Sequence, residues 1–309
     1  MGRVVLIACT SVGRALIEAM CEDERLKQIE LVGIVNLKPE AAVGKANYDS
    51  YVDLAGKYAL NIYYCSNVNE AGCVDFLRSC EADIIIQSGW SQKFGPEVLG
   101  IPRIACIGEH PAPLARGRGA ACVNWAIITG EKEWGDTFFR MEEKYDTGEI
   151  YAQERFSIET YDDVKTVYDK VAAAAVKSIR LHLVNWTNGI LKGIKQDDSK
   201  ATHYPRRRPS DGEFDFGQDA LSIYNQIRGQ AKPYPGAFFN MDFNGRRTKI
   251  YVWRASLADT SLEGGKRVIC GDGKEIILLR VQPEGQPEAW AADCLMNTKL
   301  ESMHLNRED

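Results

Sequence analysis

The chain has 309 residues, with 38 lysines and arginines against 43 aspartates and glutamates, so its formal net charge is −5. Hydrophobic residues make up 45% and charged residues 26%, which is ordinary for a globular protein and excludes collagen-like, coiled-coil and disordered classes. The sequence has neither an apolar run near the ~18 residues that span a bilayer nor a signal peptide at its N-terminus, so we expect a cytoplasmic protein without a membrane partner.

The nine cysteines are an odd number, no two of them are three positions apart, and no histidine pair has the spacing of metal ligands. These features disfavour a zinc site and a disulfide framework, so we expect no metal cofactor. The acidic balance also disfavours nucleic acid as a partner, because proteins that bind phosphate backbones usually carry a basic surface.

Short β-branched runs alternate with helical patterns over the first two hundred residues. The sequence predicts strands at 4–9, 31–35, 62–64, 84–86 and 104–107, helices at 12–21, 48–58 and 71–79, an antiparallel strand pair at 137–140 and 149–156, and a long helix at 164–184. Such alternation is typical of parallel strands joined by right-handed crossovers. We therefore predict an α/β fold with a Rossmann-like, mostly parallel sheet.

The composition changes near residue 195, where the chain becomes polar and rich in arginine and proline. A short helix is predicted at 220–228, and strands follow from Phe238 onward at 248–253, 267–270 and 275–281, with Asn244-Gly245 and Asp272-Gly273 as turns. We expect a catalytic domain at 1–195, a linker at 196–219, and a smaller C-terminal β domain at 220–309 that resembles an open OB-like barrel.

The first strand-to-helix turn, Thr10 to Gly13, lacks the Gly-x-Gly-x-x-Gly pattern that lets the backbone approach a pyrophosphate. The chain also has no Walker loop. The sheet is therefore not expected to hold a dinucleotide at this turn, and the site must lie elsewhere.

His110 stands at the end of a predicted strand and is followed by Pro111. Ligands of open α/β sheets bind at the carboxyl ends of the strands, and the proline favours an extended conformation at the residue before it. An arbitrary histidine at a strand end is more often a structural residue that bonds the backbone. The neighbouring proline and the glycine-arginine turn after it make His110 the first candidate for chemistry.

Asp146 lies between the two predicted antiparallel strands, in the segment Tyr145-Asp146-Thr147-Gly148. An Asp-x-Gly sequence alone is more often a turn. If Asp146 approaches His110, its carboxylate favours the imidazolium and raises the pKa of the ring, which suits proton transfer near neutral pH.

Several motifs occur together and in a fixed order. They are His110-Pro111 with Arg116-Gly117, the segment 123–130, Gly135 to Met141, Asp146 to Ile150, Asp211 to Phe216, Ile227 to Ala237, and residues 270–285. In this order they resemble the folate-dependent formyltransferase family, which includes nucleotide-sugar N-formyltransferases and methionyl-tRNA formyltransferase. The likeness is strongest from about residue 80 to 150.

The resemblance implies that a formyl group is transferred from N10-formyltetrahydrofolate to an amine, with His110 and Asp146 as the catalytic pair. The family's third catalytic residue is an asparagine two positions before the histidine, and here that position is Gly108. A donor to the developing oxyanion is typically worth ~10²–10³ in rate. Three explanations for the missing asparagine remain open. A backbone N–H or a water takes its place, Glu109 takes on a proton-transfer role, or the chemistry is altered. For Glu109, a solvated or structural role is favoured.

The resemblance also assigns a folate pocket after the strand at 84–86 and in the loop before Asp146. The residues that it implies for the folate are Ser88, Gly89, Trp90, Gln92, Phe94, Glu142 and Tyr145. Trp90 and Phe94 are equally plausible as core residues.

The acceptor amine is expected on a small molecule. The chain is acidic and lacks the basic insertion that tRNA-specific relatives carry after the Arg-Gly, so it is most similar to nucleotide-sugar N-formyltransferases acting on 4-amino-4,6-dideoxy sugars, including those of the pseudaminic acid pathway. Arg116, Arg118 and Tyr234 are candidates for contacting such a substrate. Methionyl-tRNA formyltransferase and a formyltetrahydrofolate hydrolase-like enzyme remain alternatives, as does a non-catalytic binding module. Enzymes of this size are often homodimers.

Overall fold

The computed structural model describes residues 1–257 and 264–296. Its chain divides into two compact units. Unit 1 comprises residues 1–122, 133–157 and 168–205, and unit 2 comprises residues 123–132, 158–167 and 206–309. Residues 297–309, expected at the end of the β domain, lie outside the described residues.

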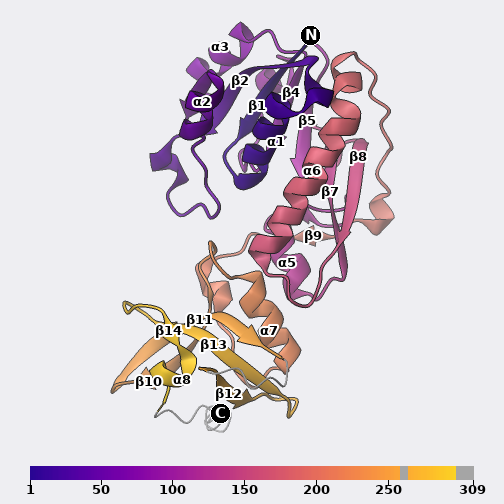
Figure 1. The fold of residues 1–309 in the computed structure, drawn as a ribbon. Helices are drawn as coiled ribbons and strands as arrows, with labels where there is room; N and C mark the ends of the chain where they lie inside the picture. The colour runs from indigo at the N-terminus through magenta and orange to yellow at the C-terminus, as the bar shows by residue number, and fades with distance from the viewer. Residues whose placement is uncertain (258–263, 297–309) are drawn as a thin grey trace. The chain divides into compact units, whose positions relative to one another are not determined.

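Unit 1 is built on a seven-stranded sheet with the strand order β3-β2-β1-β4-β5-β7-β8 (Figure 1). The first five strands in this order are parallel, and β7 is antiparallel to both β5 and β8. The strands are β1 Gly2–Ala8, β2 Ile29–Leu37, β3 Ile62–Cys65, β4 Ile84–Ser88, β5 Ala105–His110, β7 Glu133–Arg140 and β8 Ile150–Ser157. The predicted Rossmann-like, mostly parallel sheet is therefore confirmed, including its antiparallel pair.

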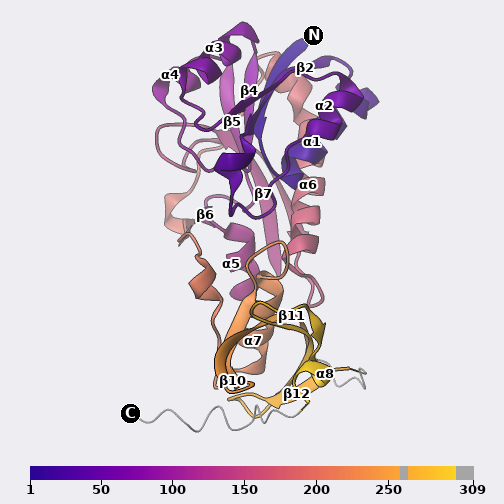
Figure 2. The same ribbon diagram turned by 90° about the vertical axis from the view of Figure 1, so that its left-hand side faces the viewer.

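Helices cover both faces of this sheet (Figure 2). α3, Ala71–Ser79, and α4, Pro96–Leu99, lie on one side, where their apolar residues join a core with Val5, Ile7 and Ile85. α1, Ser11–Glu22, and α6, Val164–Thr187, lie on the other side. There, Trp186 of α6 packs on Phe138 of β7, with ring centroids 5.5 Å apart. Because both faces of the sheet are buried, the sequences of these strands are nearly continuous runs of apolar residues.

One predicted helix is shorter than expected. α2 covers Val52–Tyr58 instead of 48–58, because Tyr51 has a left-handed backbone conformation, with φ of 57°. The hydroxyl of Tyr51 is buried and bonds both the N–H and the carbonyl of Thr10, at 2.7 and 2.6 Å. This long-range contact outweighs the local helical pattern.

The periodicity did not reveal several shorter elements. They are α5 Cys122–Ile128 and the parallel pair formed by β6 Arg118–Gly119 and β9 His203–Tyr204. Three-residue and four-residue 3₁₀ turns also occur, at 24–26, 39–42, 198–200 and 209–212. Strands of two residues carry too little pattern to be recognised from sequence.

Unit 2 contains an antiparallel sheet with the order β10-β11-β13-β12, and β14 pairs with β13. Its elements are α7 Ala220–Gly229, β10 Ala237–Phe243, β11 Arg246–Ser256, β12 Lys266–Ile269, β13 Glu275–Pro283, β14 Ala289–Trp290 and α8 Ala291–Cys294. One apolar core joins α7 to the inner face of the sheet. The predicted smaller C-terminal β domain is confirmed. Within the described ranges, none of the helices has the length and apolarity needed to cross a membrane.

Candidate active site

His110 is the last residue of β5, between β4 and β7 at the carboxyl edge of the parallel strands. The residue is 7% exposed, and Nε2 lies 2.8 Å from the carbonyl oxygen of Gly117. A carbonyl oxygen only accepts hydrogen bonds, so Nε2 carries a proton in this arrangement. The turn that follows Pro111 thus folds back and holds the imidazole in one orientation.

Asp146 approaches the other nitrogen of the ring. Its Oδ1 lies 3.8 Å from His110 Nδ1, and its Oδ2 accepts a hydrogen bond of 2.9 Å from the N–H of Gly119. The loop between β7 and β8 is held in turn by Gln196, whose side-chain amide donates to the carbonyl oxygens of Asp146 and Gly148. The structure therefore brings together the two residues that the sequence singled out.

The pKa of His110 reflects opposing effects. Burial lowers it, and this is outweighed by the sulfur of Cys122, the carboxylate of Asp146 and the Gly117 carbonyl, which together raise the pKa from 6.5 to about 10. The ring is therefore an imidazolium at neutral pH. An imidazolium can donate a proton to a leaving nitrogen and a hydrogen bond to a developing oxyanion.

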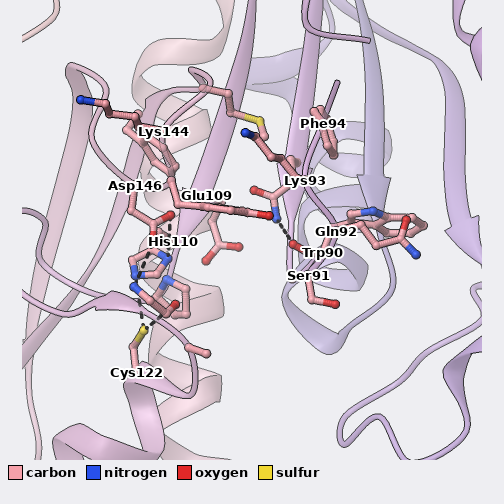
Figure 3. A pocket seen from close by; sticks show the side chains of 18 of the residues that line it. Trp90, Ser91, Gln92, Lys93, Phe94, Glu109, His110, Cys122, Lys144 and Asp146 are labelled. Atoms are coloured by element: carbon pink, nitrogen blue, oxygen red, sulfur yellow. Dashed lines mark hydrogen bonds and ion pairs between the residues drawn. The ribbon is translucent and has the colours of Figure 1, made fainter. Parts of the chain in front are cut away.

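A cavity of about 520 Å³ opens beside this pair (Figure 3). Six of the seven residues expected to contact the folate line it, namely Gly89, Trp90, Gln92, Phe94, Glu142 and Tyr145. Trp90 and Phe94 are largely buried, whereas Glu142 and Tyr145 are exposed at the cavity rim. The volume and the mixture of aromatic and polar groups are typical of a small-molecule site.

Ser88, the seventh residue, is fully buried and does not line the cavity. Its hydroxyl donates a 2.6 Å hydrogen bond to Oε2 of Glu109. Glu109 follows Gly108 on β5 and, as expected from strand alternation, faces the opposite side of the sheet from His110. It is only 3% exposed, so the solvated role considered for it is wrong.

Glu109 shares its face of the sheet with Asp136 on β7, which is fully buried. Burial, followed by the charge of Glu109, holds the pKa of Asp136 well above its usual range. Burial and the neighbouring carboxylate both penalise the charged form of Asp136, so its protonated form is favoured. The pair forms a buried acidic group behind the catalytic strand.

The packing around Gly108 explains why an asparagine is absent at this position. A Cβ placed on Gly108 would lie 2.6 Å from the ring of Phe139 and 3.2 Å from Met141. Phe139 is the direct partner of Gly108 in the pairing of β5 with β7, and its ring also lines the cavity. The space that an asparagine would enter is therefore filled by an aromatic side chain.

The three residues expected to contact the acceptor lie in different surroundings. Arg116 packs over the ring of Trp134, with its guanidinium carbon 5.7 Å from the ring centroid. Arg118 is buried, and its guanidinium bonds Gln196 and Asp198, both at 2.7 Å. Tyr234 belongs to unit 2, in the turn before β10. Neither arginine lines the cavity beside His110.

Sequence reasoning missed Cys122, Phe139 and Gln196. Cys122 begins α5, and its Sγ lies 3.3 Å from His110 Nε2. A cysteine twelve positions after the histidine has no motif of its own, so only the fold reveals this contact.

Among the residues that the structure describes, no group of three or more histidine, cysteine, aspartate or glutamate side chains is placed to hold a metal ion.

Comparisons with known proteins test the family resemblance noted in the sequence. The sequence model of the formyl transferase family matches residues 3–182, and that of the formyl transferase C-terminal domain matches residues 207–298. The chain is 29% identical over 229 residues to the bifunctional polymyxin resistance protein ArnA of Wigglesworthia glossinidia brevipalpis. That match covers 74% of this chain but only 34% of ArnA. The resemblance noted in the sequence is therefore confirmed.

Solved structures share the fold at low sequence identity. HypX from Aquifex aeolicus in complex with tetrahydrofolic acid superimposes with a TM-score of 0.63 at 18% identity, over 95% of this chain and 46% of that one. An N-formyltransferase from Helicobacter canadensis in complex with folinic acid and dTDP-3-aminofucose gives a TM-score of 0.67 at 16% identity. It is matched over 92% of this chain and its own full length. At such identities the likeness establishes the fold alone.

Proposed function

The chain belongs to the formyl transferase family, and from this premise we propose that it transfers a formyl group from N10-formyltetrahydrofolate to the amine of a nucleotide-linked amino sugar. The observation that carries the proposal is the pairing of His110 with Asp146 at 3.8 Å, beside a cavity of about 520 Å³ at the carboxyl edge of the sheet. The Helicobacter canadensis enzyme, whose complex holds a folate and a dTDP-amino sugar, has the same fold.

His110 would serve the reaction in two ways. Transfer needs a donor for the oxyanion that develops on the formyl oxygen and a proton for N10 as the bond to the formyl carbon breaks. The raised pKa of His110 keeps the ring charged at neutral pH, so it can supply both. General acid–base help of this kind is typically worth ~10²–10⁴ in rate.

We propose that the folate occupies the cavity lined by Trp90 and Phe94. Their apolar faces would cover the pterin, and backbone groups of 89–94 and 142–146 would supply its hydrogen bonds. Arg116 is proposed for the acceptor, and Tyr234 stays a prediction from the sequence. The position of Arg118, bonded to Gln196, supports an indirect role for it in holding the Asp146 loop.

For the acceptor, we propose a UDP- or dTDP-linked 4-amino-4,6-dideoxy sugar, such as an intermediate of the pseudaminic acid pathway. The net charge of −5 supports a small substrate over a tRNA. We also propose three parts of the chain: a catalytic domain at 1–195, a linker at 196–219 and a β domain at 220–309. The protein is further proposed to be a homodimer in the cytoplasm.

The test is a tetrahydrofolate-release assay with N10-formyltetrahydrofolate, run alone and with each candidate amino sugar. We expect release only when an amino sugar is present, together with a formylated sugar detected by mass spectrometry. Release at the same rate without any amine would favour a hydrolase-like enzyme. No release with any acceptor would contradict the proposed function.

A further inference from the structure

Unit 2 holds a cavity of about 510 Å³ that the proposed formyl transfer does not use. Its walls come from the segment 158–167, from α7 and from strands β11, β13 and β14, all of which belong to unit 2. The catalytic pair belongs to unit 1. Small-molecule sites occupy ~300–1,000 Å³, so this cavity is large enough for a ligand of its own.

The charged side chains that line this cavity are three arginines and one aspartate. Arg228 of α7 is only 6% exposed. Its Nε donates to the side-chain oxygen of Asn225, and its Nη1 donates to the carbonyl oxygens of Glu159 and Asp162. Within the described parts of the chain, its guanidinium forms no ion pair with a carboxylate, and burial lowers the pKa of Arg228. A buried charge without a counter-ion is costly, so a bound anion would stabilise this residue.

The other two arginines differ in how far they are already engaged. Arg280 of β13 donates to Glu288 at 2.8 Å and lies over the ring of Trp290. Arg254 of β11 is exposed, and none of the described residues forms a hydrogen bond or ion pair with its guanidinium. Its donors are therefore available to a ligand. The fork of guanidinium donors matches the oxygens of phosphate groups particularly well.

The cavity also offers aromatic faces and one carboxylate. Tyr161 and Trp290 line it and are 78% and 45% exposed, which is unusual for side chains of this size. Exposed aromatic rings beside arginines are the surfaces on which nucleobases stack. One oxygen of Asp163 accepts the N–H of Thr166 at 2.9 Å. Its other oxygen can accept a hydrogen bond from a hydroxyl group of a ligand.

We propose that this cavity binds a nucleoside diphosphate, either free or with a sugar on its terminal phosphate. Arg228 and Arg254 hold the diphosphate, Tyr161 and Trp290 stack on the base, and Asp163 accepts a hydrogen bond from the ribose. A simple anion would use the arginines alone, and an uncharged ring would use the aromatic residues alone. Binding here involves no covalent step, and the inference does not depend on the proposed formyl transfer.

Calorimetric titration of the full chain tests the site, with UDP, dTDP, ADP and GDP as the probes. We expect saturable binding of at least one of them. Inorganic pyrophosphate, which lacks the base, and the matching nucleoside, which lacks the phosphates, should each bind at least about 10-fold more weakly. UDP-glucose separates the two sources of the ligand. Binding as tight as that of UDP assigns the site to the sugar-linked form, and weaker binding assigns it to the free diphosphate.

Variants locate the binding. Arg254→Ala should raise the Kd of the best nucleotide at least about 10-fold, because charge-assisted hydrogen bonds are lost. Arg254→Lys keeps the charge but not the fork, so its Kd should lie between the two. Tyr161→Ala should raise the Kd at least about 5-fold. The matched control is Arg247→Ala, since Arg247 is exposed on the same strand and does not line the cavity. It should keep the wild-type Kd, and all of these variants should keep the wild-type unfolding midpoint.

The outcomes separate this site from the proposed function. If the proposed acceptor also binds as a nucleotide in unit 1, that second site should remain in Arg254→Ala. Identical isotherms for the wild type and Arg254→Ala, or a nucleoside that binds as tightly as its diphosphate, would overturn the site. Formylation of an amino sugar alongside identical isotherms would leave the proposed function standing, whereas Arg254-dependent binding without any formylation would leave only this site.

Discussion

At the scale of single residues, His110 differs from an ordinary strand-end histidine in its surroundings. One ring nitrogen faces the Asp146 carboxylate, and the other faces the Gly117 carbonyl and the Cys122 sulfur. These acceptors are themselves fixed by the backbone, because Gly119 donates to Asp146 and Gln196 holds the loop from the other side. The orientation of the imidazole is thus set before any substrate binds.

Replacing His110 by alanine should abolish turnover without unfolding the protein. We expect kcat to fall by ~10²–10⁴, because the proton donor is lost, while folate-analogue binding changes little. Steady-state kinetics and circular dichroism check this. His203→Ala is the matched control, since His203 is exposed on β9, and should have wild-type rates. Near-native rates in the His110 variant would remove this residue from the mechanism.

The raised pKa of His110 also predicts a pH-dependent stability. The folded pKa is about 10 and the unfolded value is about 6.5. The stabilising effect of the charged ring is therefore fully present below pH 6.5 and is lost as the pH rises toward 10. We expect the difference in unfolding free energy between wild type and His110→Asn to shrink across this window. A difference that stays constant from pH 6.5 to 10 would mean that the folded ring has an ordinary pKa.

At the scale of elements, the pairing of β5 with β7 decides the chemistry on either side of the sheet. Gly108 and Phe139 face each other on the side of His110, and Glu109 faces the side of Asp136. β5 thereby places the His110 imidazole beside the cavity and buries the Glu109 carboxyl on the other face, where Asp136 of β7 also lies. The alternation of side chains along a strand gives these two neighbouring residues different surroundings.

This pairing predicts the effect of restoring the family's asparagine. Gly108→Asn should destabilise the protein by about 1–3 kcal/mol, because the new side chain overlaps the Phe139 ring. Urea unfolding measures the loss. The double variant Gly108→Asn with Phe139→Ala should behave differently from the sum of its parts, because the clash is removed. Gly56→Asn is the control, since nothing lies within 4 Å of a Cβ there. An unchanged midpoint for Gly108→Asn would contradict the described packing.

At the scale of the whole molecule, the charge balance separates the two acceptor classes. A net charge of −5 gives little attraction to a polyanion. We expect no formylation of initiator methionyl-tRNA under conditions where the amino sugar is formylated. Filter binding at low and physiological salt provides the second measurement. Saturable tRNA binding with a steep salt dependence would instead favour the tRNA alternative.

The sequence was sufficient for the architecture, because strand periodicity and burial on both faces leave a local record. The five parallel strands, the antiparallel pair and the longer strands of unit 2 were predictable for this reason. Besides the short elements that were missed, α2 begins later than predicted, because Tyr51 is held by a contact to Thr10, forty-one positions away. Local patterns do not encode such contacts.

For the site, the sequence was enough to select His110 and Asp146 as candidates, since a proline, a turn and an ordered set of motifs mark them. Their surroundings could be known only from the folded chain. Cys122 reaches the imidazole because the turn after Pro111 folds back on the end of β5, and Phe139 fills the place beside Gly108 because β7 is antiparallel to β5. Register and turn geometry create these contacts, and both depend on residues far apart in the chain.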